Sequence, residues 1–288
     1  MKFARQIVLL SKPRVISLLV ITGAAGVWKA SEGNLDYSVL WVVVISGALA
    51  SAGSNAINQA FDSDIDALMR RTRHRPVPSN HVGALIATIV GIISITLALG
   101  LMFVWTILLA TGLMLFAAAV YVFVYTIILK RSSWNNIVIG GAAGAFPPLI
   151  GATAVSGEIT AVGLYMFVFV FFWTPPHFWT LSILLKDDYA EAKVPMLSVV
   201  ASLRDTTVQI MLYVVLLMAL SWLPFVAGYA GLTFAISCSV LTGYWLYKSV
   251  LMYKDPSSKN TLSTYKFSLL HLALIFLVLS VEPYLLWY

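Results

Sequence analysis

The chain alternates between long apolar stretches and short polar breaks along almost its whole length. A helix that crosses a membrane needs about 20 mostly apolar residues. Cutting the chain at its charged, Pro and Gly clusters gives nine such segments, near 15–31, 38–60, 83–104, 107–129, 134–156, 160–184, 207–227, 231–252 and 267–286. The pattern therefore predicts an all-α integral membrane protein in which residues 1–288 form a single transmembrane domain of nine helices.

Two of these cuts fall inside long apolar stretches and rest on length. Residues 82–129 carry no charge over 48 positions, about twice one bilayer crossing, so the chain must turn back within them. We expect that turn around Trp105. A second turn is expected where Pro224 is followed by Gly228, because both residue types interrupt helices.

Composition agrees with a membrane protein, since 60% of the residues are hydrophobic and only 10% are charged. Soluble domains carry about a quarter charged residues. Every Lys and Arg except Lys29 falls on one side of the predicted spans, which is the distribution of cytoplasmic loops. The net charge of +6 therefore reports orientation and not nucleic-acid binding. We expect a multi-pass protein of a prokaryotic cell (inner) membrane, with the N-terminus cytoplasmic and the C-terminus outside.

The acidic residues gather in two clusters on the predicted cytoplasmic side. Asp62, Asp64 and Asp66 follow the second span, and Asp187, Asp188 and Glu191 follow the sixth. Four spans separate the clusters, which suggests a four-helix unit used twice plus a ninth helix. Internal repeats of this kind often place a site where the two units meet.

The first cluster has the spacing of a metal-binding helix face. Asn58, Asp62 and Asp66 recur every four residues, so on one helix they share an arc of roughly 80°, whereas Asp64 points elsewhere. Hard oxygen ligands suit Mg²⁺ together with phosphate oxygens. A second face at Asp188 could then hold one diphosphate from the other side. The alternative is an ordinary solvated loop with internal ion pairs.

Arg71 and Arg75 follow on the next turns and could donate bidentate hydrogen bonds to phosphate. A diphosphate at the mouth of a lipid-facing bundle favours an isoprenoid diphosphate as substrate, because its head is anionic and its tail is apolar. Metal binding would stabilise the charge that develops on the leaving diphosphate. The carboxylates then need not act as bases.

The segment N-x3-D-x3-D-x2-M-x-R-T-x2-R-P at residues 58–76 resembles the UbiA superfamily of intramembrane prenyltransferases. The segments W-T-P-P-H-F at 173–178 and V-P-M-L at 194–197 are similar to the branch that acts on haem. Departures from that pattern are Ser63 in place of a basic residue, Asn80 in place of Gly, and Ser198 in place of Pro.

The resemblance implies helices around a central cavity open laterally to lipid, with Mg²⁺ as cofactor. Farnesyl diphosphate would donate its farnesyl group to a vinyl group of haem B, and water would complete the product. Catalytic roles are implied for Asn58, Asp62, Asp66, Asp187 and Asp188, with metal binding by Asn58, Asp62, Asp66 and Asp188. Diphosphate binding is assigned to Arg71, Arg75, Tyr125, Lys130, Arg131 and Lys186. For Lys130 and Arg131, interfacial anchoring is an equal alternative.

Two histidines fall within predicted spans, where ionisable residues usually have a function. We expect His177 to contact haem, as an iron ligand or through a propionate. It follows Pro175 and Pro176, so its structural alternative is hydrogen bonding to the helix that these prolines loosen. For His271, haem contact and interhelical hydrogen bonding stay equally open.

Two other functions compete with this reading. One is an aromatic prenyltransferase of quinone synthesis, which shares the diphosphate chemistry. The other is a secondary transporter, whose charged residues should lie near the middle of the membrane and not at one face. The haem reading also gives two candidate partners, a haem A synthase and a terminal oxidase assembly.

Overall fold

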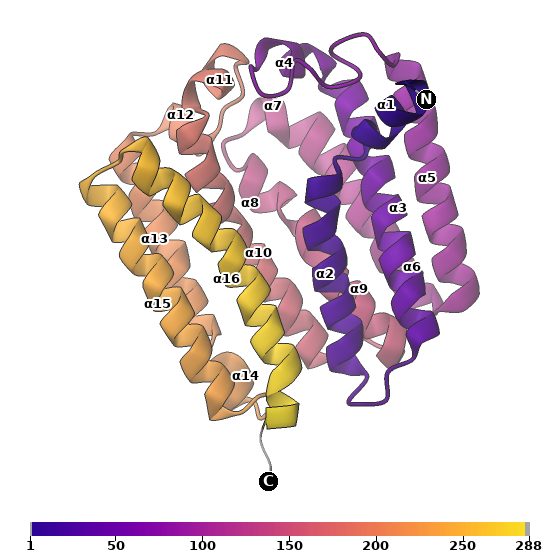
Figure 1. The fold of residues 1–288 in the computed structure, drawn as a ribbon, viewed down its shortest axis with the longest axis vertical. Helices are drawn as coiled ribbons and strands as arrows, with labels where there is room; N and C mark the ends of the chain where they lie inside the picture. The colour runs from indigo at the N-terminus through magenta and orange to yellow at the C-terminus, as the bar shows by residue number, and fades with distance from the viewer. Residues whose placement is uncertain (1, 286–288) are drawn as a thin grey trace.

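The computed structural model describes residues 2–285, and every regular element in that range is helical. The long helices are α2 (Pro13–Ala30), α3 (Tyr37–Phe61), α5 (Ala84–Trp105), α6 (Leu108–Ala119) continued by η1 (Val120–Leu129), α9 (Ala142–Ser156), α10 (Ala161–Leu184), α13 (Leu203–Leu220), α15 (Leu232–Lys254) and α16 (Ser258–Leu285). Shorter helices are α1 (Lys2–Leu10), α4 (Ser63–Leu68), α7 (Lys130–Ser132), α8 (Asn136–Gly140), α11 (Lys186–Glu191), α12 (Leu197–Val200) and α14 (Leu223–Val226). The long helices run roughly along one axis (Figure 1).

Seven helical segments within residues 2–285 are long and apolar enough to cross a membrane, which makes this a multi-pass membrane protein. They are Tyr37–Phe61, Ala84–Trp105, Leu108–Ser132, Asn136–Ser156, Ala161–Leu184, Leu203–Val226 and Ser258–Glu282. The apolar helix Val15–Ala30 is shorter. Helix α15 carries Lys248 and Lys254 in its last two turns. The predicted all-helical class is confirmed, whereas the count of nine spans stays a prediction.

The predicted turns agree with the structure, but one predicted boundary is wrong. Helix α5 ends at Trp105, and the chain turns at the short helix that begins at Leu223. Helix α16 begins at Ser258 and not near 267. Its first turns are polar, and the hydroxyls of Thr261 and Thr264 donate to the backbone carbonyls of Ser257 and Asn260. Hydropathy alone misses a helix that continues into such a polar stretch.

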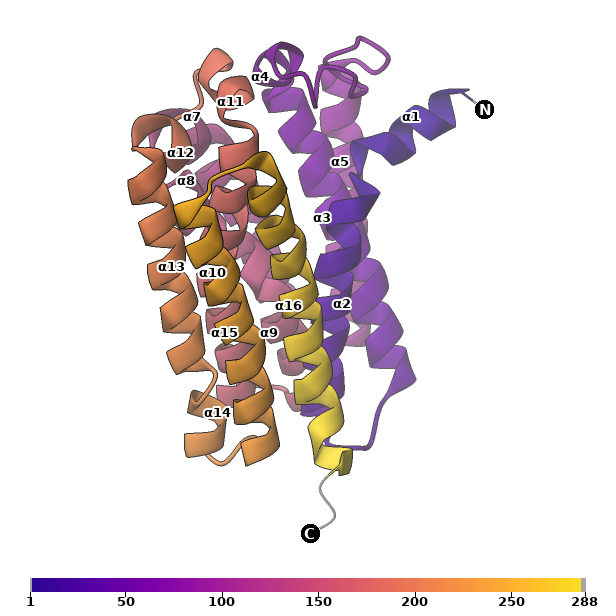
Figure 2. The ribbon, with the colours of Figure 1, turned by 60° about the vertical axis from the view of Figure 1, so that its left-hand side comes forward.

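The helices form a ring, and each half of the ring packs around its own apolar core. One core joins α10, α13, α15 and α16, and the other joins α2, α3, α5, α6 and α9. Contact between α2 and α16 closes the ring, with the Trp28 indole donating to the Ser280 carbonyl at 3.0 Å. Figure 2 shows α4, α11 and α12 gathered with α1 toward one end, and α14 lies at the other.

Large apolar side chains cover the outer surface of the ring. The most exposed examples, at about two-thirds or more, include Leu85, Val104, Leu108 and Val240. A water-soluble protein does not present so much continuous apolar surface. The outside of the bundle is therefore suited to lipid, and the polar groups gather inside and at one end.

Small residues let α2 lie against α9 with backbones almost in contact. A Cβ on Gly151 would lie 2.2 Å from the Gly23 carbonyl oxygen, and one on Gly26 would lie 2.1 Å from the Pro148 carbonyl oxygen. Close backbone approach through small residues is a common way for membrane helices to associate. The close α2–α9 contact thus depends on the absence of a side chain at Gly26 and at Gly151.

We expect Gly151→Ala to lower the melting temperature in detergent, since α2 and α9 must separate to admit the methyl group. Overpacking of this kind costs about 1–3 kcal/mol. Gly100→Ala is the matched control, because nothing lies within 4 Å of its added Cβ, and it should leave the melting temperature equal or higher. Equal melting of the Gly151→Ala variant and the wild-type protein would contradict the packing argument.

Candidate active site

A cavity of about 450 Å³ lies between the two apolar cores. One end of its wall carries charged side chains, namely Lys12, Asp66, Arg71, Arg75 and Lys130. Most of the remaining wall is apolar or aromatic, with contributions from α2, α3, α6, α9, α10 and α16. Residues of α2 and α16, the first and last of the long helices, also form part of the wall. This is one chamber with a charged end and an apolar body.

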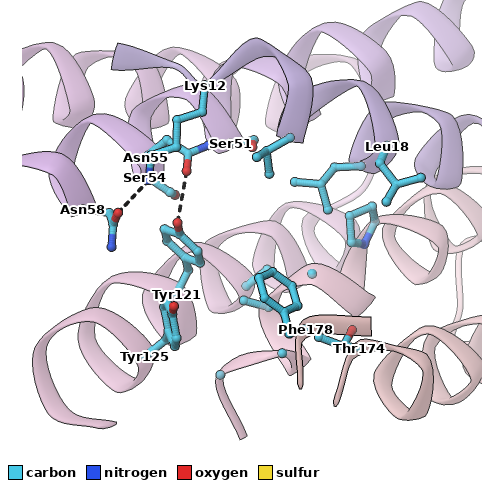
Figure 3. Close-up of a pocket in the computed structure, with 18 of the residues that line it drawn as sticks. Lys12, Leu18, Ser51, Ser54, Asn55, Asn58, Tyr121, Tyr125, Thr174 and Phe178 are labelled. Atoms are coloured by element: carbon cyan, nitrogen blue, oxygen red, sulfur yellow. Dashed lines mark hydrogen bonds between the residues drawn. The ribbon is translucent and has the colours of Figure 1, made fainter. Parts of the chain in front are cut away.

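Asn58 is the centre of the charged end. Its amide nitrogen donates to Asp62 Oδ2 at 2.7 Å and to Thr126 Oγ1 at 3.0 Å, and its Oδ1 accepts from Lys12 Nζ at 2.7 Å. Figure 3 shows Lys12 and Asn58 together, with the Tyr121 hydroxyl donating to Asn55 Oδ1 at 3.0 Å nearby. Asn58 thus ties the start of α2, the end of α3 and η1 together.

The three aspartates of the first cluster differ in environment, as their spacing predicts. Asp62 and Asp66 are 0% and 1% exposed, and they pair with Lys130 and with Arg75 Nη1 (2.6 Å) respectively. Asp64 is exposed and accepts two hydrogen bonds from Arg131. These bonds lower the pKa of the Asp64 carboxyl. Asp66 forms part of the cavity wall, whereas Asp62 lies behind the wall and contacts two of its residues, Asn58 and Lys130.

The segment 58–66 is not the single helix that the spacing suggested. Helix α3 ends at Phe61, and Asp62 both follows it and precedes α4, with a backbone conformation outside the helical range. The backbone N–H of Asp66 still donates to the Asp62 carbonyl at 2.7 Å. The break therefore redirects the chain while keeping the buried carboxylates on the inner side.

A π-helix supplies the opposite wall of the charged end. Residues 120–129 of η1 form i→i+5 bonds, and the N–H of Lys130 donates to the Tyr125 carbonyl. Such wide turns are rare and cluster at functional sites. The rings of Tyr121 and Tyr125 lie 5.5 Å apart along η1, and a Cβ on Gly140 would lie 2.3 Å from the Tyr125 ring. The π-helix thus directs both tyrosines and Lys130 toward the cavity.

The second acidic cluster lies at the same end of the bundle. An apolar cluster joins Ile65 and Met69 beside α4 to Tyr189, Val194 and Met196 around α11. Asp188 is buried, whereas Lys186 and Asp187 are exposed, and none of the three forms part of the cavity wall. The structure brings the two clusters to one face of the protein, which disfavours a mid-membrane transport site. It does not place Asp187 or Lys186 at the cavity, because both point outward.

The buried side chains near Asn58 offer oxygen atoms, which are the ligands that a hard cation prefers. Asp62 Oδ1 is buried and has no hydrogen-bond partner among the described residues. No group of three His, Cys, Asp or Glu side chains within residues 2–285 lies close enough to hold a metal. Mg²⁺ commonly takes one or two carboxylates and completes its shell with water and phosphate oxygens. Asn58, Asp62 and Asp66 would hold such an ion only together with an anionic ligand.

His177 lies in the cavity wall, as expected, but not as the proline hypothesis requires. Its Nδ1 lies 2.7 Å from Ser268 Oγ on α16, so it is not hydrogen-bonded to its own helix. Helix α10 runs without interruption through both prolines. The structural alternative proposed for His177 is therefore wrong, because the ring bonds across to a neighbouring helix.

Two further residues assigned to ligand binding also lie outside the cavity wall. His271 is 0% exposed in the α10–α15–α16 core, where Nε2 lies 3.0 Å from Thr242 Oγ1, so the structure favours interhelical hydrogen bonding over haem contact. Arg131 pairs with exposed Asp64 and also donates to the Phe61 carbonyl. The prediction that Arg131 contacts diphosphate is not supported by this position.

Sequence reasoning did not assign Lys12 to the site. Lys12 looked like an orientation signal, since it precedes the first span, yet its ammonium group reaches the buried amide of Asn58. Its φ of 52° lies in the left-handed region, which is uncommon outside glycine and asparagine. The signal that could have revealed it is its position directly before Pro13, which starts α2.

The all-helical bundle and its polar-ended internal cavity define a polytopic membrane protein with an intramembrane binding chamber. The chain belongs to the UbiA prenyltransferase family, whose profile matches residues 19–276. Two solved structures share this fold. A digeranylgeranylglyceryl phosphate synthase has a TM-score of 0.79 at 21% identity, covering 99% of this chain and 100% of that one. A UbiA homologue from Archaeoglobus fulgidus, bound to GPP and Mg²⁺, has a TM-score of 0.69 at 16% identity, covering 96% and 100%.

Curated relatives are considerably closer in sequence. The protoheme IX farnesyltransferase of Thermus thermophilus is 41% identical over 278 residues, which are 96% of this chain and 46% of that protein. The protoheme IX farnesyltransferase of Synechococcus sp. is 44% identical over 268 residues, covering 92% of this chain and 81% of that protein. The chain thus spans about half the length of the Thermus relative.

We expect Lys12→Met to raise the melting temperature of the ligand-free protein at neutral pH. Burial lowers the pKa of the Lys12 amine well below 10.5, and nearby Arg75 and Lys130 lower it further. The unfolded chain therefore keeps this proton to higher pH than the folded protein, so wild-type stability should rise with pH through that window. The gain from Lys12→Met should then shrink as the pH approaches about 10.

Melting curves in detergent between about pH 6 and 10 measure this difference. Lys254→Met is the control, since Lys254 is exposed at the end of α15. A melting difference between Lys12→Met and wild type that does not change with pH would contradict the argument.

Proposed function

We propose that this chain transfers the farnesyl group of farnesyl diphosphate to a vinyl group of haem B. The vinyl carbon forms a bond to the farnesyl C1 as the C1–O bond to diphosphate breaks. Water then adds to the adjacent carbon and loses a proton, giving haem O and diphosphate. The observation that carries the proposal is the cavity of about 450 Å³, whose wall joins a charged end to an apolar body containing His177.

The charged end suits a prenyl diphosphate head. Lys12, Arg71, Arg75 and Lys130 all reach this part of the wall, and they outnumber the buried carboxylates. Guanidinium and ammonium groups bind phosphate oxygens through charge-assisted hydrogen bonds. Mg²⁺ held by Asn58, Asp62 and Asp66 would supply further stabilisation of charge on the leaving group. Binding of GPP and Mg²⁺ by the Archaeoglobus homologue supports this assignment.

The apolar body suits the prenyl chain and a tetrapyrrole. An allylic cation reacts with water unless water is excluded, and the wall beyond the charged end is formed by side chains such as Leu18, Met114, Phe178 and Leu272. The rings of Tyr121 and Tyr125 also form part of the wall. His177 is proposed to contact the haem from this wall. The 41–44% identity to protoheme IX farnesyltransferases supports haem B as the acceptor.

The distribution of lysines and arginines supports one orientation of the protein in the membrane. The end that carries α4, α11 and the α15–α16 turn holds almost all lysines and arginines, as cytoplasmic faces do. We therefore propose the inner membrane of a prokaryotic cell, with this end cytoplasmic and the last described residues of α16 outside. Both substrates would enter the cavity from the membrane, and diphosphate would leave to the cytoplasm. Asp188 remains a proposed metal ligand, and a haem A synthase or terminal oxidase assembly a proposed partner.

Incubation of the purified protein with haem B, farnesyl diphosphate and Mg²⁺ tests the proposal. Mass spectrometry of the extracted pigment should show haem B plus one farnesyl group and one hydroxyl group. Parallel incubations should replace haem B with 4-hydroxybenzoate or a naphthoate. Prenylation of either aromatic acid with haem B unchanged would reject the haem assignment in favour of quinone synthesis.

Asp62→Asn and Asp66→Asn should each reduce farnesyl transfer by roughly 100-fold or more, because each carboxylate is proposed to hold the Mg²⁺ that stabilises charge on the leaving diphosphate. Asp64→Asn is the matched control in the same segment. Its ion pair with Arg131 is exposed, so the rate should stay within about twofold of wild type. Rates are compared only among variants with wild-type melting profiles. Equal losses at Asp62 and Asp64 would contradict the assigned geometry.

Activity should require a hard divalent cation. Excess EDTA should abolish transfer, and Mg²⁺ should restore it, since few protein ligands are available and the ion must bind with the diphosphate. Haem binding, followed by absorbance in the same samples, should be unchanged by EDTA. Full turnover in excess chelator would refute the metal requirement.

A further inference from the structure

His177 is held by two residues of α16. Its Nδ1 lies 2.7 Å from Ser268 Oγ, and its ring stacks on Tyr265 with centroids 4.9 Å apart. On its own helix it stacks on Trp173 with centroids 4.3 Å apart and an interplanar angle of 17°. The Trp173 indole in turn donates to the Ser268 backbone carbonyl at 3.1 Å. The imidazole is therefore held in one orientation by two stacking rings and one hydrogen bond.

The hydrogen bonds around Ser268 determine which ring nitrogen carries the proton. A serine hydroxyl has one proton, and that of Ser268 donates to the Tyr265 carbonyl at 2.7 Å. A carbonyl oxygen can only accept, so the Ser268 hydroxyl has no proton left for His177. The 2.7 Å contact must then run from His177 Nδ1–H to Ser268 Oγ. Neutral His177 consequently carries its lone pair on Nε2.

Nε2 is the free nitrogen, and it belongs to a residue of the cavity wall. The hydrogen bonds of the described residues include none to His177 Nε2, and this atom is not among the buried polar atoms that lack a partner. The ring nitrogens of His271 differ from those of His177. Its Nε2 is engaged by Thr242, and its unpartnered Nδ1 is buried in the core.

We propose that Ser268 is a positioning residue that holds His177 as the Nδ1–H tautomer, so that Nε2 binds the iron of a metalloporphyrin in the cavity. This inference rests on the proposed function for the nature of the acceptor. It selects between the two haem contacts expected for His177: a lone pair binds iron, whereas it repels a propionate carboxylate, which needs a donor. A histidine whose second nitrogen is fixed by a hydrogen bond is the usual arrangement at metal sites.

Titrations with three porphyrins, without farnesyl diphosphate, separate the two contacts. The porphyrins are haem B, metal-free protoporphyrin IX and haem B dimethyl ester. With iron ligation, the wild-type protein should bind haem B and its dimethyl ester about tenfold or more tightly than the metal-free porphyrin, since one tenfold step is 1.4 kcal/mol. His177→Ala should lose this preference, and added imidazole should restore the wild-type Soret spectrum.

Equal binding of haem B and metal-free protoporphyrin IX by the wild-type protein would overturn the inference. So would a loss of affinity in His177→Ala that affects both free-acid porphyrins but not the dimethyl ester, since that pattern indicates a propionate contact. Porphyrin binding is measured in the absence of farnesyl diphosphate, and farnesyl transfer is assayed separately. Failure of transfer with intact iron ligation would reject the proposed function and leave the ligand assignment standing.

Ser268 is tested through the spectrum of bound ferric haem. Ser268→Ala removes the acceptor of the Nδ1–H bond and should weaken haem B binding several-fold with a changed Soret or electron paramagnetic resonance signal. Affinity for metal-free protoporphyrin IX should stay within about twofold. Ser268→Thr keeps the hydroxyl and should restore the wild-type signal.

Thr242→Ala is the matched control for Ser268→Ala. It removes the hydroxyl that contacts His271 of α16, which is also a buried histidine but lies outside the cavity wall. The haem spectrum should therefore equal that of wild type, even though the melting temperature falls by a similar amount in both variants. A Ser268→Ala protein with the wild-type spectrum and affinity would show that Ser268 does not position His177.

Discussion

The buried carboxylate of Asp62 is the constraint on which the rest of the site depends. A charge at 0% exposure in an apolar bundle is tolerated only with a partner, and Lys130 supplies it. Lys130 reaches Asp62 because it directly follows the π-helix η1, whose wide turns also direct Tyr125 inward. Gly140 leaves room for the Tyr125 ring on the other side. One ion pair thus couples the end of α3 to the π-helix and, through it, to α8.

The sequence predicts the elements better than the contacts. The apolar stretches locate most of the long helices to within a few residues, apart from the start of α16. The four-residue spacing separates buried Asp62 from exposed Asp64, because both features depend on local sequence. It cannot locate the π-helix, which has the same composition as an ordinary span. It also assigns Arg131 and His271 to the site, whereas tertiary packing turns them toward Asp64 and Thr242. Residue type shows what a side chain can do, but packing decides what it faces.

Two departures from the family pattern have simple structural explanations. Asn80 occupies a left-handed conformation with φ of 58°, which glycine adopts freely and asparagine tolerates better than most residues. Ser198 is buried, and its hydroxyl donates to the Ser182 carbonyl at 3.0 Å. That bond ties the segment after α11 to the end of α10, so this loop is held without the usual proline. Ser63 starts α4, and nothing in the structure explains its replacement of a basic residue.

The ligand-free charged end is internally paired, which has a consequence for binding. Lys130 and Arg75 neutralise Asp62 and Asp66, and Lys12 engages Asn58. A diphosphate can take these cations only if the carboxylates gain another positive partner, since otherwise two buried charges lose theirs. A divalent cation can bind the carboxylates only if the Lys and Arg groups gain an anion. In the proposed complex each ligand would remove the penalty that the other would meet, so we expect their binding to be mutually dependent.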